Sequence, residues 1–309
     1  MQKNSLPSHL SPSSISEYYW NHLGELTDYS KFHFLTRNFL LKQSSRAKQE
    51  LDILLFSKDT THEQWLLLIE SLTNPKQPTN KDRIAYLQQY PTLRQTSRAC
   101  FARIFGEKIW GIDYQNDFLS VSTMGDVEPV WNTLMQDTKA ISCLATYALN
   151  FLFLENHFFH FQSEIDLIIH FYEIYDRLTE QNNSQTVQSD ALTVQLYFLT
   201  HTIINDSLFY TRPIPEAHRQ MHLDRLSLLS ERIIHTPEKF TTDALCEFVA
   251  VYTLLHRPCP TIQFISSYLA SVHSPEHQYL MKQNSFMSLS EAEHSNVLYI
   301  CGWSALKIP

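Results

Sequence analysis

The sequence contains little glycine, with five residues in 309, and none of them forms a G-x-G-x-x-G pattern or a Walker loop. Nucleotide-binding folds of those kinds are therefore disfavoured. The G-x-S-x-G elbow, the H-E-x-x-H helix and the paired-aspartate box are also absent, which removes the best-known signatures of serine hydrolases, zincins and terpene synthases. Alternating strand-type patterns are nearly absent.

No dense block of positive charge occurs. Lys and Arg total 24 against 32 Asp and Glu, which gives a formal net charge of −8. Binding to nucleic acid in general depends on a basic stripe that neutralises phosphates. The sequence therefore predicts no nucleic-acid partner.

Long apolar runs and cysteine pairs are also missing. The most apolar stretch, 141–154, is shorter than the roughly 20 residues needed to cross a bilayer. Residues 1–14 are polar, without the apolar centre of a signal peptide. The five cysteines form no C-x-x-C pair, which is typical of free thiols in a reducing compartment. These features predict a cytoplasmic protein with no membrane partner.

What the chain does have is apolar and aromatic residues in helical periodicity. Hydrophobic residues make up 43% and aromatic residues 13% of the sequence, enough for a packed core. Helix start signals such as Ser163 before Ile165 and Thr241 with Asp243 recur at short intervals, and most prolines fall between the periodic segments. We predict an all-α protein with about a dozen helices of ordinary length.

The second half alternates between two kinds of helix. One kind is apolar nearly all round and must be covered on both sides, whereas the other carries a single apolar stripe. This alternation repeats about every fifty residues and is typical of a paired-helix α/α toroid or solenoid. The first kind occupies 140–158, 189–206, 241–256 and 293–306, and the second kind 164–180, 217–235 and 261–273.

No long linker divides the chain, so the sequence favours a single helical-repeat domain over 1–309. A helical subregion over 1–137 and a more regular α/α-repeat region over 138–309 are possible within it. The shorter amphipathic segments of the first part are expected near 15–26, 31–43, 46–57, 62–73, 81–90 and 93–105.

Four short motifs in the C-terminal half suggest a relationship. They are Leu-Thr-His at 199–201, Asp-Ala-Leu-Cys-Glu-Phe at 243–248, Gln283 with Phe286, and Glu-His-Ser-Asn-Val-Leu at 293–298. In order and spacing, the chain from about residue 187 resembles an uncharacterised family of α/α-toroid-like helical proteins associated with bacterial specialised-metabolite gene clusters. The chain departs from that pattern in having Glu293 and Asn296 where the family prefers Tyr and Thr. The resemblance implies a bacterial toroid-like fold but no particular chemistry.

The candidate catalytic residues are His201, Asp243, Glu247 and His294, which fall on three helices of the all-apolar kind. Asp243 and Glu247 share one helix face at i, i+4 spacing. In a toroid these four residues would converge, and two imidazoles with two carboxylates suit general acid–base chemistry. The alternative is that both histidines are core residues with satisfied hydrogen bonds and that Asp243 caps its helix.

A second hypothesis for this region is a zinc site made by Cys246, Cys301 and His294, since thiolate and imidazole are zinc ligands. Buried free cysteine also packs as a small hydrophobe. We predict no metal site and no cofactor here. His218 and His222 stand at i, i+4 spacing in a polar helical turn and are expected to face solvent.

These observations favour a pocket or groove, lined by inner helices, that binds or modifies a small molecule or peptide. The alternative is a non-catalytic helical scaffold that binds a partner protein on its concave face. A zinc-dependent enzyme is a third possibility. Gathered candidate residues would favour the first hypothesis, and dispersed ones the second.

Overall fold

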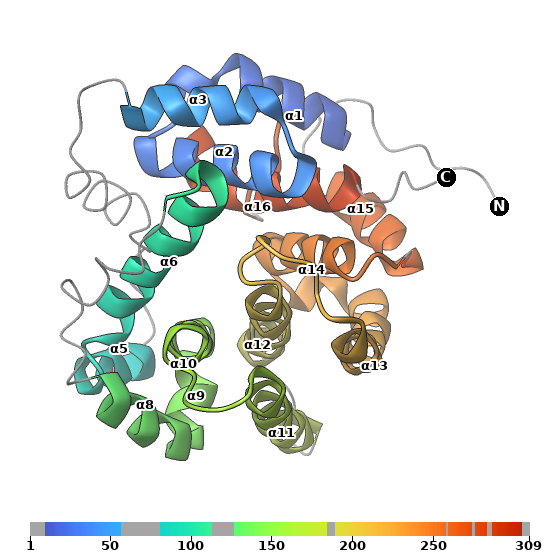
Figure 1. The fold of residues 1–309 in the computed structure, drawn as a ribbon. Coiled ribbons are helices and arrows are strands. Elements are labelled where there is room, and N and C mark those ends of the chain that lie inside the picture. The colour runs from blue at the N-terminus through green and yellow to red at the C-terminus, as the bar shows by residue number, and fades with distance from the viewer. Residues whose placement is uncertain are drawn as a thin grey trace. The chain divides into compact units, whose positions relative to one another are not determined.

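The computed structural model describes residues 10–56, 81–112, 127–183, 189–257, 259–273, 276–282 and 286–304. Within them the chain forms fourteen α-helices and two short 3-10 helices, and no strand (Figure 1). The all-α prediction is confirmed. The amphipathic segment predicted at 62–73 lies outside the described residues. No described helix combines the length and the apolar character that a membrane crossing needs.

The chain divides into two compact units, each assembled from separate stretches of sequence. The first comprises Met1–Ser57, Gln188–Leu196 and Pro213–Pro309, and the second Lys58–Val187 and Tyr197–Arg212. The single helical-repeat domain over 1–309, with subregions that meet near residue 137, stays a prediction. The N-terminal stretch belongs to the first unit because two of its helices pack against the last helix of the chain.

The first unit surrounds a core formed by its two most buried helices, α14 and α16. Two helices near the N-terminus, α1 and α2, pack against α16, and α3 packs against α2 (Figure 1). The elements of this unit are α1 (Pro12–Asn21), η2 (Leu23–Glu25), α2 (Asp28–Lys42), α3 (Ser45–Phe56), α13 (Glu216–His235), η4 (Pro237–Lys239), α14 (Thr242–Leu254), α15 (Pro260–Val272) and α16 (Leu289–Ser304).

Short polar side chains start these helices by accepting hydrogen bonds from otherwise unpaired backbone N–H groups. Ser11 accepts from the backbone of Ser14 at the start of α1, and Thr241 accepts from that of Ala244 at the start of α14. The sequence placed the second of these signals at the correct residue.

Helices α14 and α16 run in the same direction. His294 near the start of α16 contacts Asp243 at the start of α14, and near their ends Thr253 Oγ1 donates a hydrogen bond of 2.8 Å to the carbonyl of Gly302. Close approach is possible because Gly302 has no side chain: a Cβ there would stand 2.8 Å from the Val249 carbonyl carbon. This close packing places the N-terminal halves of the two helices side by side.

The second unit is organised around α10, which is packed by α6, α8, α9 and α11. Buried Trp131 donates its indole N–H to the Leu152 carbonyl over 3.0 Å and so joins α8 to α10. Helix α12 (Ser189–Asp206) contributes its residues from Tyr197 onward to this unit. The other elements are α5 (Lys81–Gln89), α6 (Leu93–Trp110), α8 (Val127–Gln136), α9 (Thr138–Leu144), α10 (Thr146–Phe159) and α11 (Glu164–Asn183).

One sequence-based expectation about surface residues is wrong. His222 on α13 is fully buried, not exposed to solvent. It stands one helical turn before buried Leu226, so it lies on the same face as the apolar stripe.

Candidate functional site

Three side chains of the first unit, Asp243, Glu247 and His294, gather at one point. Each offers an oxygen or nitrogen atom that lies within 4.8 Å of those of the other two. Helix α14 supplies the two carboxylates one turn apart, and α16 supplies the imidazole from its second turn. Asp243 and Glu247 were predicted to share one face of their helix, and that face contacts α16.

Two hydrogen bonds hold the Asp243 carboxylate in place. The Nδ1 atom of His294 and the hydroxyl of Ser295 both donate to Oδ1 of Asp243, each over 2.7 Å. The side chains of Asp243 and His294 are 33% and 43% exposed, whereas Glu247 is only 3% exposed. The cluster is thus open to solvent at Asp243 and His294 and closed at Glu247.

The charge at His294 is set by its carboxylate neighbours. Partial burial disfavours the imidazolium, but the Asp243 carboxylate, with Glu247 and Glu293, more than offsets this and raises the pKa of His294 to about 9. His294 is therefore protonated at neutral pH and forms an ion pair with Asp243.

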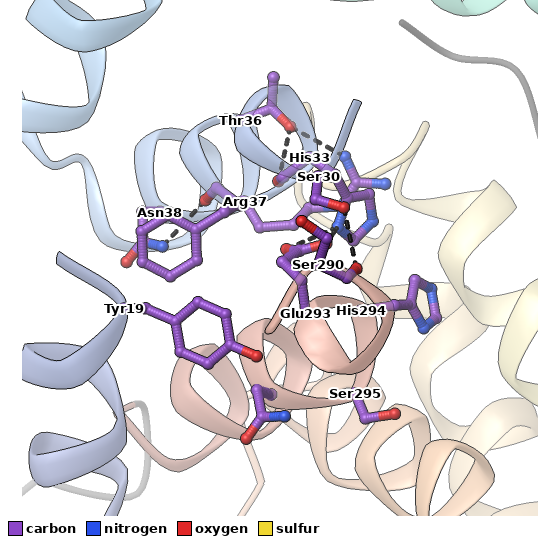
Figure 2. A network of polar contacts seen from close by, with 12 residues as sticks. Tyr19, Ser30, His33, Thr36, Arg37, Asn38, Ser290, Glu293, His294 and Ser295 are labelled. Atoms are coloured by element: carbon purple, nitrogen blue, oxygen red, sulfur yellow. Dashed lines mark hydrogen bonds and ion pairs between the residues drawn. The ribbon is translucent and has the colours of Figure 1, made fainter. Parts of the chain in front are cut away.

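A second histidine lies beside the cluster. His33 of α2 contacts Glu293 of α16 with Nδ1–Oε1 and Nδ1–Oε2 distances of 3.0 and 3.1 Å, and its ring centroid is 5.0 Å from that of His294. Burial, with positive charge on Arg37 and His294, lowers the pKa of His33 well below its ordinary value. A neutral His33 therefore donates its Nδ1–H to Glu293. Figure 2 shows this pair where α2 meets α16, with His294 beside it.

Further polar contacts fix α2 against the start of α16. The hydroxyl of Ser30 donates to the Ser290 carbonyl over 2.9 Å, and the backbone N–H of Thr27 donates to the Ser290 hydroxyl over 2.9 Å. Figure 2 draws Ser30 and Ser290 within the same network as Glu293. The position of His33 relative to His294 is thus held by several bonds and not by one contact.

The structure brings together three of the four predicted catalytic residues. The fourth, His201, belongs to the second unit, where its Nδ1 atom lies 3.0 Å from Oδ1 of Asn150. The site described here consists of the residues that the first unit gathers by itself. Asp243 does not cap α14 as the alternative interpretation supposed, because Thr241 fills that position.

Sequence reasoning did not find Ser295, Glu293 or His33 as parts of this region. Ser295 and Glu293 flank His294, and both lie within the motif at 293–298. His33 is separated from Glu293 by 260 residues, and no sequence pattern links the two.

The hypothetical zinc set of Cys246, Cys301 and His294 is wrong. Among the described residues, the gathered ligand atoms belong to Asp243, Glu247 and His294, and neither cysteine is part of the group. Both thiols are buried. Burial, with nearby carboxylates, raises the pKa of Cys246 well above its ordinary value, and burial raises that of Cys301 to about 12.

Comparisons with known proteins identify no relative. A scan against models of protein families, a search among curated proteins and a search among solved structures each found no match. The family resemblance of the C-terminal half therefore stays a prediction, and function must be argued from the site.

Proposed function

We propose that this protein binds or modifies a small molecule or peptide at the cluster of Asp243, Glu247 and His294. The observation that carries the proposal is the convergence of these three side chains from two helices onto one partly exposed point. Imidazole beside two carboxylates provides both a hydrogen-bond donor and acceptors to a polar ligand, and the same groups suit acid–base chemistry.

The proposed setting is a bacterial α/α toroid or solenoid whose inner helices include α14 and α16. Support comes from their shared direction and from contacts that join residues 51 and 49 positions apart. The single-stripe helix α15 lies between them in sequence. This agrees with the fifty-residue alternation of inner and outer helices. A role in specialised metabolism rests on the sequence resemblance alone, and a cytoplasmic location rests on the unpaired cysteines and the polar residues 1–14.

A thermal-shift screen of small molecules and short peptides tests the proposal. Hits on the wild-type protein are retested by calorimetry against Asp243→Asn and His294→Gln. Matched controls are Glu231→Gln and His235→Gln, which change exposed residues of α13 in the same unit.

We expect at least one ligand whose binding is lost in both cluster variants and kept in both controls. A screen without hits, or ligands that bind all variants equally, would contradict the proposal. Capture of a partner protein that tolerates both cluster variants would favour the scaffold alternative instead.

A further inference from the structure

The geometry points to a binding site for one divalent transition-metal ion, of the class of Zn²⁺, with Asp243, Glu247 and His294 as its ligands. This inference deepens the proposed function, because it rests on the same cluster and adds what the cluster holds. It differs from the cysteine-based site considered above in every ligand except His294.

The first argument is distance. Ligands with metal bonds of about 2.0–2.2 Å stand at most roughly 4.4 Å apart across one ion. The three donor atoms already lie within 4.8 Å of one another without any ion. The largest separation therefore exceeds this limit by at most about 0.4 Å.

The second argument is the type of donor. One imidazole nitrogen with two carboxylate oxygens suits zinc, manganese and ferrous iron, whereas magnesium and calcium prefer oxygen ligands alone. A three-residue set leaves a position open for water or for a ligand group, as in catalytic zinc sites. The partial exposure of Asp243 and His294 gives that position access to solvent.

The third argument concerns the groups behind the ligands. Metal-binding side chains are usually oriented by further hydrogen bonds, and a carboxylate that accepts from a histidine is a common example. Here the Ser295 hydroxyl, which is not a ligand, donates to the ligand Asp243 and orients its carboxylate. The pair of buried Glu293 and His33 lies beside the ring of His294 and helps to fix its surroundings.

The fourth argument is charge. Asp243 and Glu247 stand one helical turn apart, and like charges at this spacing repel each other. Glu247 is almost entirely buried, and Glu293 of α16 adds a third carboxylate nearby. A divalent cation would offset this concentration of negative charge better than the single imidazolium of His294 does.

The test uses the full-length protein, stripped with EDTA and dialysed into metal-free buffer. Zinc chloride is titrated in competition with a chromogenic chelator, and bound metal is counted by elemental analysis after gel filtration. The variants are Asp243→Asn, His294→Gln and Ser295→Ala, with Glu231→Gln and His235→Gln as matched controls. Circular dichroism checks that each variant keeps its helices, and the partly exposed Asp243 and His294 are preferred to buried Glu247 for that reason.

We expect one zinc ion per wild-type chain. Loss of either ligand should weaken binding more than about 100-fold, and Ser295→Ala should weaken it about 10- to 100-fold, as second-layer changes do. The controls should bind as the wild type does. Failure of the wild type to retain zinc, or zinc that remains in both ligand variants, would overturn the site. If zinc does not bind but a small molecule or peptide from the screen binds the metal-free protein through the cluster, the proposed function stands without the metal site. If zinc binds but no small molecule or peptide does, the metal site stands without the proposed function.

Discussion

The imidazole of His294 donates to Oδ1 of Asp243 over 2.7 Å and so joins α16 to α14 across 51 residues of sequence. This contact depends on the parallel packing of the two helices. At their far ends Gly302 allows α16 to lie directly against Val249 and Ala250. The site is therefore a consequence of how the core of the first unit packs.

That dependence makes Gly302 a test of the packing. We expect Gly302→Ala to lower the free energy of unfolding by about 1–3 kcal/mol, because the added Cβ would stand 2.8 Å and 2.9 Å from backbone atoms of α14 and overpack the core. Urea unfolding measures the change. Gly24→Ala is the control, since a Cβ there has no atom within 4 Å. Equal stability of the two variants would show that α16 has room to move away from α14.

The His294–Asp243 ion pair predicts a pH dependence of stability. The folded-state pKa of about 9 lies above the ordinary value of 6.5, so the stabilisation is fully present below pH 6.5 and is lost as pH rises through 9. Solvent screens this partly exposed pair, so the effect should be about 1 kcal/mol.

Unfolding by urea between pH 6 and pH 10, in EDTA, measures this loss. Asp243→Asn should make the decline smaller. The other charged or titratable groups near the ring are Glu247 of α14, Glu293 of α16, and His33 and Arg37 of α2. An unchanged decline in the variant would mean that other groups cause it.

Glu155 in the second unit predicts a separate dependence on pH. It is 1% exposed, and burial raises its pKa from an ordinary 4.5 to about 7, although hydrogen bonds from Cys100 and Thr96 act in the opposite direction. The unfolded state then binds fewer protons than the folded state between these values. The contribution of Glu155 to the free energy of unfolding is therefore largest below pH 4.5. It falls by roughly 3 kcal/mol as pH rises to about 7.

Replacement of this carboxyl should remove the effect. We expect Glu155→Gln to unfold with a smaller decline between pH 4.5 and pH 8 than the wild type and to be the more stable protein at pH 8. The measurement is chemical unfolding across this range. The control is Glu128→Gln, which changes an exposed residue of α8. A variant less stable than the wild type at pH 8 would show that the ionised carboxylate is stabilising.

The end of α2 offers a stabilising substitution. Gln43 adopts the left-handed conformation with φ of 52° and ψ of 37°, and its side chain is exposed. Glycine adopts this conformation without steric cost, so we expect Gln43→Gly to raise the free energy of unfolding by about 1 kcal/mol. Thermal unfolding should show a higher midpoint for Gln43→Gly than for Gln43→Ala, and the reverse order would contradict this.

Local features of the fold were predictable where they depend on neighbouring residues. The segment 241–256 was expected to be buried all round, and α14 is buried at most of its positions. The start of α14 at Thr241 followed from the capping preference of threonine. The burial of His222 was missed because the prediction relied on the polar character of histidine. Its position four residues before Leu226 places it on the buried face of α13.

The site was predictable only in part, for the same reason. Helical periodicity alone places Asp243 and Glu247 on one face. The contacts of His294 with Asp243, and of His33 with Glu293, join residues 51 and 260 positions apart. No local rule supplies such pairs, since they arise when whole helices pack.

The sequence by itself determined that the chain is helical, which segments are buried on all sides, and which carboxylates share a face, because these properties follow from periodicity, capping and composition. Only the tertiary structure decided that α14 and α16 lie parallel and in contact, that α2 returns to cover α16, and that Cys246 and Cys301 lie outside the group of gathered ligand atoms. These outcomes depend on close packing between distant segments, where the missing side chain of Gly302 and the hydrogen bonds of Ser30 and Ser295 select one arrangement.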